Sequence, residues 1–248
     1  MKLSVVIPAY NEAQSLPETV KAIYHELVAN EIKHEILVVN DNSKDDTIEV
    51  LEGLKGHVPS LRWVSNTGNN GFGMAVRMGL DKFNGDIVAI MMADLSDSPK
   101  DLVTFYRSMV AGGFDCVFGS RFIKGGETYD YPTLKKILNR FFNTIVRFVF
   151  RLKYNDVTNA FKMYHKDTIQ GLRPFLSPHF NLTLELPLKA IVRGYSYTVV
   201  PNSWRNRKFG ESKLKIREMG SRYFFILLYC LVEKYFSQND YKKDSVTN

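Results

Sequence analysis

The sequence predicts an α/β protein in which a mostly parallel central sheet is flanked by helices. Short apolar runs, which predict strands, alternate with helix-like segments over roughly the first 120 residues. The clearest run, residues 87–92, is continuously apolar and is followed at once by a helix start, which is typical of a strand buried on both faces of a parallel sheet. The 248 residues are 45% hydrophobic and 24% charged, the composition of an ordinary globular protein with ample material for a core.

The predicted elements follow one another in a regular order. Strands are expected at residues 3–7, 35–39, 61–64, 87–92 and 115–119. The helices between them are expected to begin near residues 16, 46, 71 and 99. Three of these starts carry capping signals: a Ser15–Glu18 capping box, Asp45 or Asp46, and Ser98 followed by Pro99. No internal repeat, low-complexity tract or linker interrupts this order.

Beyond about residue 120 the pattern changes to longer helices. Residues 134–152 predict a helix on which four side chains share one stripe: Arg140, Thr144, Arg147 and Arg151. Its other faces are rich in Phe and Ile, so the helix fits either a membrane interface or a core helix with a solvated basic stripe. Residues 223–232 predict an apolar C-terminal helix that packs on the core, with contact to a membrane surface as the alternative.

Charge and cysteine content restrict the partners and the compartment. Lys and Arg number 33 against 26 Asp and Glu, and the net charge of +7 favours an anionic partner such as a nucleotide, a lipid phosphate, a membrane surface or a nucleic acid. Two cysteines indicate no disulfide framework. The first ten residues do not resemble a signal peptide, and no apolar run approaches the ~18 residues that span a bilayer. We therefore expect a cytoplasmic protein.

Polar residues follow three of the predicted strands. Tyr10 and Glu12 follow the first, Asp41 the second and Asp94 the fourth. The carboxyl ends of parallel strands meet at one sheet edge, where open α/β sheets bind ligands. An acid there can hold a metal ion and through it a diphosphate, and Tyr10 can stack on a nucleobase. Taken singly, each residue also fits a structural loop or a helix cap.

A glycine-rich stretch, residues 68–76, precedes the third predicted helix. Its backbone N–H groups could approach a phosphate. It does not match a dinucleotide fingerprint, because Val76 stands where a third glycine is required and because the stretch follows the third strand instead of the first. The sequence therefore argues against a Rossmann dehydrogenase.

Several motifs together carry a resemblance to a known family. The main ones are VVIPAYNE at 5–12, VVNDNS at 38–43 and ADLS at 93–96, with further matches at 118–122, 156–162 and 207–214. They resemble family 2 glycosyltransferases of the GT-A fold, and most closely the dolichyl-phosphate mannose synthase branch. The resemblance covers about residues 3–215. We therefore expect a catalytic domain over residues 1–218, followed by a C-terminal helix and polar tail over 219–248.

The resemblance implies a nucleotide site and a metal site. It assigns nucleotide binding to Pro8, Ala9, Tyr10, Glu12, Asp41, Ala93 and Asp94. The family's Asp-x-Asp motif implies a divalent cofactor, Mg²⁺ or Mn²⁺, but here it falls on Met92-Ala93-Asp94, and a methionine does not bind a hard cation. Asp97 could join Asp94 as a substitute metal ligand, or basic side chains could neutralise more of the diphosphate charge.

The resemblance also implies an acceptor site with four cations that bind a phosphate: Arg121, Lys135, Arg207 and Lys213. Asp94, Arg121 and Arg207 form the implied catalytic set. A phosphate acceptor is already anionic and needs cations to hold it in line, whereas a sugar hydroxyl needs a general base. Asp156 is the best candidate for such a base, unless it is a loop or cap residue.

Two further residues, Glu185 and His179, each have two interpretations. Glu185 is expected to be structural or to pair with an acceptor-site cation. His179 is expected in a surface loop, with a late metal ligand as the alternative.

The predicted function is the inverting transfer of one sugar from a GDP- or UDP-linked donor to a polyprenyl or dolichyl phosphate. The expected partners are these substrates, the cytoplasmic face of the membrane, where the protein would bind peripherally during cell-envelope synthesis, and a membrane-anchor subunit, but no nucleic acid. Two alternatives stay open. One is a transferase to a glycan hydroxyl in cell-surface polysaccharide synthesis, and the other is a nucleotide-sugar-binding protein without turnover, which Met92 favours.

Overall fold

A seven-stranded sheet forms the centre of the computed structural model, which describes residues 1–207 and 216–243. Its strands are β1 (Leu3–Ala9), β2 (His34–Asn40), β3 (Leu61–Ser65), β4 (Ile87–Ile90), β5 (Cys116–Ser120), β7 (Lys162–His165) and β8 (Tyr197–Pro201). They lie in the order β3-β2-β1-β4-β7-β5-β8. All pairs are parallel except those of β7, which runs antiparallel to both β4 and β5. The predicted α/β class with a mostly parallel sheet is confirmed.

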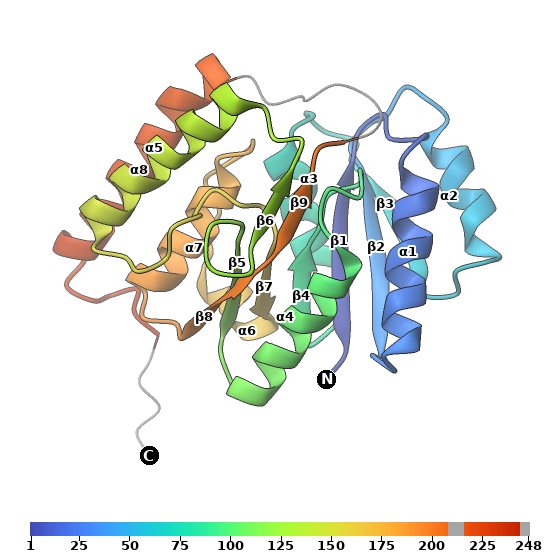
Figure 1. Cartoon of the computed structure of the whole chain (residues 1–248), viewed down its shortest axis with the longest axis horizontal. Coiled ribbons are helices and arrows are strands. Elements are labelled where there is room, and N and C mark those ends of the chain that lie inside the picture. The colour runs from blue at the N-terminus through green and yellow to red at the C-terminus, as the bar shows by residue number, and fades with distance from the viewer. Residues whose placement is uncertain (208–215, 244–248) are drawn as a thin grey trace.

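Helices cover both faces of this sheet (Figure 1). One face packs against α1 (Leu16–Ala29), α2 (Thr47–Lys55) and α4 (Pro99–Gly112). The core on the other face includes α3 (Phe72–Lys82), α5 (Thr133–Phe150), α6 (Lys166–Gly171), α7 (Leu182–Val192) and α8 (Ile216–Phe236). A small parallel pair, β6 (Glu127–Tyr129) and β9 (Ser203–Arg205), lies apart from the main sheet.

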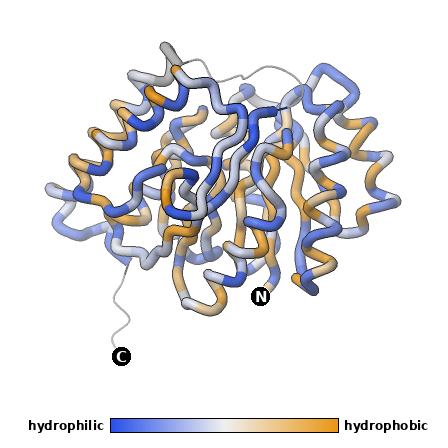
Figure 2. The backbone as a smooth tube through the Cα atoms, in the orientation of Figure 1, coloured by the Kyte–Doolittle hydropathy of each residue, from blue (hydrophilic) through white to orange (hydrophobic). Residues whose placement is uncertain are grey.

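The central strands are buried on both sides, which explains why their sequences are continuously apolar. In β1, Val5 and Ile7 face the core beneath α1, whereas Val6 faces the core beneath α3. The apolar colouring of these strands is visible in Figure 2, where the outer helices alternate between apolar and polar residues. This two-sided burial holds the strand ends, and the loops that follow them, in fixed positions.

The predicted capping side chains do not make the expected bonds. Ser15, Asp46 and Ser98 occupy N-cap positions, but none forms a side-chain cap hydrogen bond. The Ser15 hydroxyl instead donates to Glu12 Oε2 (2.7 Å), and Asp45, one residue before the cap of α2, accepts the Thr47 N–H (3.2 Å). The helices begin where predicted, while these side chains brace the loops beside the sheet edge.

The glycine-rich stretch serves close packing between backbones. A Cβ on Gly73 would lie 2.5 Å from the carbonyl oxygen of Ser177, and one on Gly71 would lie 2.5 Å from that of Pro178. The Gly71 N–H donates to Asp41 Oδ2 (2.7 Å). The hypothesis that these glycines cradle a phosphate therefore gains no support, since this amide is already engaged.

Candidate active site

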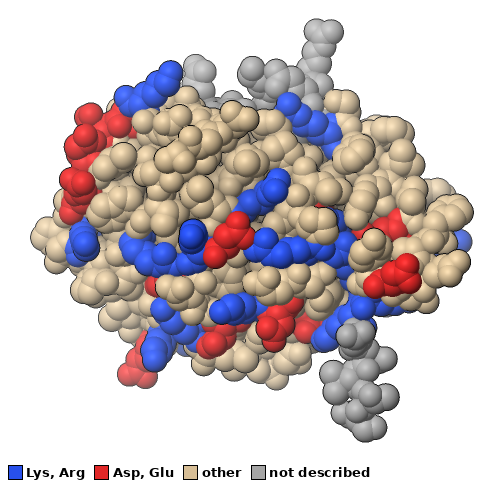
Figure 3. Space-filling view, turned by 180° about the vertical axis from the view of Figure 1, so that it is seen from behind, with Lys and Arg blue, Asp and Glu red and all other residues tan. Residues whose placement is uncertain are grey.

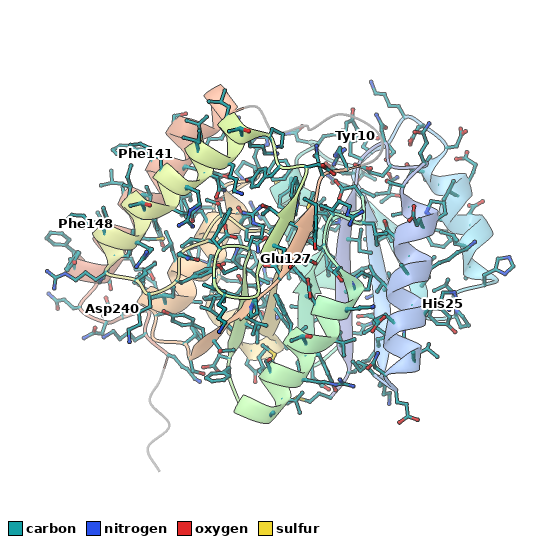
Figure 4. The ribbon with its side chains drawn as sticks, viewed as in Figure 1. Tyr10, His25, Glu127, Phe141, Phe148 and Asp240 are labelled. Carbon is teal, nitrogen blue, oxygen red and sulfur yellow. The ribbon has the colours of Figure 1, made fainter. Side chains whose placement is uncertain are left out.

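A cavity of about 550 Å³ opens at the carboxyl ends of β1, β2 and β4. Figure 4 shows Tyr10 above these strand ends, at the upper edge of the sheet. The predicted site residues that line the cavity are Pro8, Ala9, Tyr10, Glu12, Asp41, Asp94, Asp97, Arg121, Lys135 and Arg207. Ala93 does not line it: this residue is buried, and its carbonyl accepts a hydrogen bond from Thr19 (2.8 Å). Lys213 lies outside the described residues.

The acid after β2 organises the loops on the nucleotide side. Asp41 is almost fully buried, and its two carboxylate oxygens accept from Asn66 Nδ2 and the Gly71 N–H, both at 2.7 Å. These bonds link the loops after β2 and β3, which are neighbours in the sheet. Asp41 therefore shapes this wall of the cavity, besides any contact that it makes with a ligand.

Arg207 forms an ion pair with Asp94, the acid that follows β4. Arg207 Nη2 donates to Asp94 Oδ2 at 2.7 Å, and its Nη1 lies 3.6 Å from Glu12 Oε1. The other oxygen of Asp94 accepts the Ser96 N–H (3.1 Å). Arg207 follows β9, so this contact joins a late segment of the chain to the loops after β1 and β4.

The second predicted metal ligand is poorly placed for a cation. Asp97 is 2% exposed, and its Oδ2 accepts from the Met92 N–H at 3.5 Å. Burial, with a smaller contribution from the charge on Asp94, raises the pKa of Asp97 to about 7. Within residues 1–207 and 216–243, no group of three or more His, Cys, Asp or Glu side chains is arranged to hold a metal ion.

Replacing Asp97 with asparagine should stabilise the protein more at pH 8 than at pH 5. Folding raises the pKa of Asp97 from 3.8 to about 7, so the folded state holds the proton more tightly and stability falls as the pH rises between these values. Because asparagine resembles the protonated acid and cannot ionise, its advantage should grow by roughly 2 kcal/mol across this range. Urea denaturation from pH 5 to pH 8 measures it, with the exposed Asp46→Asn as control. An advantage that is constant with pH would contradict the assignment.

One of the acceptor-side cations, Arg121, is held by a buried ion pair. Arg121 Nε and Nη2 donate to the two oxygens of Asp156 at 2.8 and 2.7 Å, and both side chains are buried. Burial disfavours the charged guanidinium, but Asp156 outweighs this effect and raises the pKa of Arg121. Burial, together with the charges of Arg121 and Arg207, lowers the pKa of Lys135. Three of the four predicted cations thus line one cavity.

Two carboxylates and one histidine, whose roles the sequence left open, now have defined surroundings. Asp156 is completely buried and paired with Arg121, so it is not a general base. Glu185 is structural, as one of its two interpretations had it: it pairs with Lys189 (2.7 Å) and accepts the N–H groups of Leu176 and Ser177. His179 lies in a loop, as expected, between α6 and α7; it is half-buried there and lines the cavity.

The cavity residues missed by the sequence reasoning include Tyr131, Asn159, Trp204 and Arg222. Tyr131 and Trp204 pack together with ring centroids 4.8 Å apart, and Lys135 Nζ lies 5.9 Å from the Trp204 centroid. Trp204 is one of two tryptophans and lies three residues before Arg207. This position is the only signal in the sequence that could have indicated that Trp204 belongs to the site. Arg222 comes from α8, whose apolar sequence gave no reason to expect a cavity residue.

The family model for Glycosyl transferase family 2 matches residues 4–173. The chain belongs to glycosyl transferase family 2. This family 2 protein is a glycosyltransferase, as its resemblance predicted. The matched region includes Tyr10, Asp41, Asp94 and Arg121 but ends before Arg207.

Curated relatives and solved structures agree with this membership. The family 2 chain is 31% identical to a dolichol-phosphate mannosyltransferase of Pyrococcus furiosus over 87% of its own length and 60% of the relative's. It is 29% identical to a polyprenol monophosphomannose synthase of Mycolicibacterium smegmatis, over 85% and 80% of the two lengths. Glucosyl-3-phosphoglycerate synthase of Mycobacterium tuberculosis, solved with Mn²⁺, UDP-glucose and phosphoglyceric acid, shares the fold at a TM-score of 0.71 and 18% identity, over 93% and 79% of the chains. The predicted GT-A fold is confirmed.

Proposed function

We propose that this glycosyltransferase moves one sugar from a nucleotide diphosphate sugar to a polyprenyl phosphate, with inversion at the anomeric carbon. A phosphate oxygen of the acceptor would form the new bond to that carbon while the bond to the donor diphosphate breaks, and its electron pair would leave with the nucleotide. No proton has to be removed from the acceptor in this reaction. The similarity to a dolichol-phosphate mannosyltransferase and a polyprenol monophosphomannose synthase supports a lipid-phosphate acceptor.

One observation carries the proposal: the cavity supplies cations on the acceptor side, while its carboxylates are already engaged. Asp41 binds Asn66 and Gly71, Asp94 binds Arg207 and Ser96, and Glu12 accepts from Ser15. Asp97 is almost fully buried, and its Oδ2 accepts from the Met92 N–H at 3.5 Å. Such a site suits an acceptor that needs no general base, which is the property of a phosphate and not of a sugar hydroxyl.

A product assay tests the proposal. The full chain is incubated with a panel of GDP- and UDP-sugars and polyprenyl phosphate, and the products are identified by mass spectrometry, with Asp94→Ala as the inactive reference. We expect one donor to give a polyprenyl-phosphate sugar of inverted anomeric configuration. Transfer to a glycan in place of the lipid would favour the polysaccharide alternative, and nucleotide-sugar binding without any transfer would favour the binding-protein alternative.

We also propose that α5 and α8 bind the membrane surface. The two helices pack side by side: the rings of Phe142 and Tyr223 are 5.1 Å apart, and Lys234 Nζ donates to the Phe150 carbonyl (3.2 Å). Their exposed apolar side chains form what we call the α5/α8 surface: Leu134, Ile137, Leu138, Phe141, Ile145, Phe148, Phe224, Phe225, Leu228, Val232, Tyr235 and Phe236. Phe141 and Phe148 project away from the body of the protein (Figure 4). No helix in the described part of the chain is long and apolar enough to cross a membrane.

The basic residues of α5 contribute less to this surface than the sequence pattern predicts. Arg140 turns inward, where its guanidinium lies 4.5 Å from the Phe122 ring centroid and donates to the Asn155 carbonyl. Arg147 and Arg151 are exposed. On the face seen from behind the view of Figure 1, Lys and Arg lie in a band mixed with Asp and Glu (Figure 3), so the positive charge is not gathered into one patch there. The apolar side chains therefore carry most of the argument for membrane binding.

Replacing Phe141 and Phe148 together with serine should weaken binding to lipid vesicles more than tenfold. These side chains are 67% and 86% exposed, and burying a phenylalanine in an apolar phase is worth about 1.5–3 kcal/mol. Vesicle flotation measures the effect, and Val28→Ser with Val110→Ser, on α1 and α4, is the matched control. Anionic lipid should add roughly 1 kcal/mol for each basic residue near the surface. Equal flotation of both variants, or none of the unmodified protein, would overturn this part of the proposal.

A further inference from the structure

Two aromatic side chains lie beside the acceptor-side cations. Tyr131 lies between β6 and α5, and Trp204 belongs to β9; both are half-buried and line the cavity. Their ring centroids are 4.8 Å apart. Arg121 Cζ lies 5.5 Å from the Tyr131 centroid, and Lys135 Nζ lies 5.9 Å from that of Trp204. Each of these cations is therefore within cation–π range of one of the two rings.

The backbone around Trp204 is paired on both sides. Trp204 is opposite Thr128 in the β6–β9 pair, which lies in front of the main sheet in Figure 1, and it is opposite Asp97 in an isolated bridge. The next residue, Arg205, donates its N–H to the Ser96 carbonyl (2.9 Å). Strand pairing holds this segment in place before any ligand binds, which lowers the cost of ordering it in a complex.

This combination of rings and cations fits one class of phosphate. In a polyprenyl phosphate the phosphate group is attached directly to an apolar chain, so a phosphate bound by Arg121 and Lys135 would place the first carbons of that chain beside the two rings. Binding pockets orient a ligand with a few polar groups and contact the rest of it through apolar and aromatic side chains. A hydrophilic phosphate ester would instead bring hydroxyl groups against the rings, where they would lose hydrogen bonds to water.

Apolar side chains continue from this part of the cavity along α5. Lys135 is in the first turn of α5, and Leu138 follows it by three residues, so the two side chains are neighbours on the helix. Leu138 is exposed and belongs to the α5/α8 surface, as does Leu134. An apolar chain that begins beside Trp204 would therefore meet further apolar side chains on its way out of the cavity.

We propose that Tyr131 and Trp204 bind the first isoprene units of the acceptor and thereby select a lipid phosphate over a hydrophilic phosphate ester. The inference rests on the proposed function, because it takes a phosphate as the acceptor group. The two rings recognise the chain, whereas Arg121 and Lys135 recognise the phosphate. The cations alone do not make this selection, since a hydrophilic ester presents the same phosphate group to them.

Tryptophan fluorescence tests the contact directly, because the chain has only two tryptophans. In the Trp63→Phe variant Trp204 is the sole tryptophan; Trp63 lies on β3 and does not line the cavity. With UDP or GDP present, farnesyl phosphate, a soluble prenyl phosphate, should shift the emission to shorter wavelength as its chain displaces water from the indole, and glycerol phosphate should not. No shift with farnesyl phosphate, or equal shifts with both esters, would overturn the proposal. A shift with UDP-glucose or GDP-mannose in place of farnesyl phosphate would assign the rings to the donor sugar.

Kinetics with the same two esters test the selectivity. In Trp204→Ala and in Tyr131→Ala, the KM for farnesyl phosphate should rise about tenfold or more, while inhibition by glycerol phosphate stays the same, because only the prenyl chain loses apolar contact. Trp204→Phe keeps an aromatic ring and should retain most of the affinity. Trp63→Ala is the matched control, since it removes a half-buried tryptophan outside the cavity. Calorimetric affinity for UDP and GDP should stay within about twofold in every variant, which shows that each one folds.

The outcomes separate this inference from the proposed function. An emission shift of Trp204 with farnesyl phosphate, but no lipid product from any donor, would refute the proposed transfer and leave the lipid contact standing. Lipid product from Trp204→Ala with an unchanged KM for farnesyl phosphate would refute the role of the rings and leave the proposed function standing.

Discussion

Replacing Arg121 with alanine should slow sugar transfer about a hundredfold or more while leaving nucleotide affinity nearly unchanged. Arg121 is fixed by two hydrogen bonds to Asp156 and lines the cavity, so it can hold an acceptor phosphate in line without reorganising. Loss of one fixed charge at a reacting centre typically costs this much. Turnover is measured with polyprenyl phosphate, and nucleotide affinity by calorimetry. Arg140→Ala is the matched control, because Arg140 packs on the same Phe122 ring but does not line the cavity.

A second variant separates catalysis from folding. Arg121→Ala leaves the buried Asp156 carboxylate without its partner, which by itself can cost about 3–5 kcal/mol of stability. Arg121→Met with Asp156→Asn removes both charges and should regain stability but not turnover. If the double variant transfers sugar at the normal rate, Arg121 has no role in the reaction.

Replacing Glu233 with alanine should destabilise the protein by about 3–5 kcal/mol. Glu233 of α8 accepts hydrogen bonds from Arg193 at 2.7 and 3.0 Å, and both side chains are almost fully buried. Arg193, which follows α7, also donates to the carbonyls of Gly171 and Arg173, so its charge stays buried when Glu233 is removed. Urea denaturation measures the change, with Glu52→Ala on the exposed face of α2 as control. A loss below about 1 kcal/mol would show that α8 is not held by this pair.

Glu233→Ala should also weaken acceptor binding in the active site. Arg222 of α8 lines the cavity, so loosening the helix at Glu233 should raise the KM for the lipid acceptor in the surviving folded protein. Arg193→Met with Glu233→Leu removes both charges and should recover most of the lost stability.

The local part of the fold was predictable from the sequence, and the non-local part was not. Apolar runs and helix starts that lie within a few residues of each other predict β1 to β5 and the helices between them. β7 was missed because it is four residues long and begins with Lys162, a buried side chain whose ammonium donates to the carbonyls of Val157 and Thr183. No pattern of hydrophobicity indicates a strand that starts with a buried lysine.

The candidate site shows the same division. Strand-end logic brought Tyr10, Asp41 and Asp94 together, because the carboxyl ends of parallel strands meet. The partners of these residues come from distant segments: Arg207 lies 113 residues after Asp94, and Asp156 lies 35 residues after Arg121. Spacing in the sequence carries no information on such pairs, so the assignments of Arg121, Lys135 and Arg207 depended on the resemblance alone.

The position of β7 fixes the order in which the molecule can be assembled as it leaves the ribosome. β4 pairs with β1 on one side and with β7 on the other, where Ile87 is opposite His165. Until that segment has been synthesised, β4 presents an open hydrogen-bonding edge, the kind of edge that invites pairing with another chain. The part of the sheet whose strand ends carry Tyr10, Asp41 and Asp94 can therefore form early. Only β7 connects this part to β5, and it thereby brings Arg121, which follows β5, close to the other site residues. A nascent chain stalled between these strands is where we expect chaperones to be needed most.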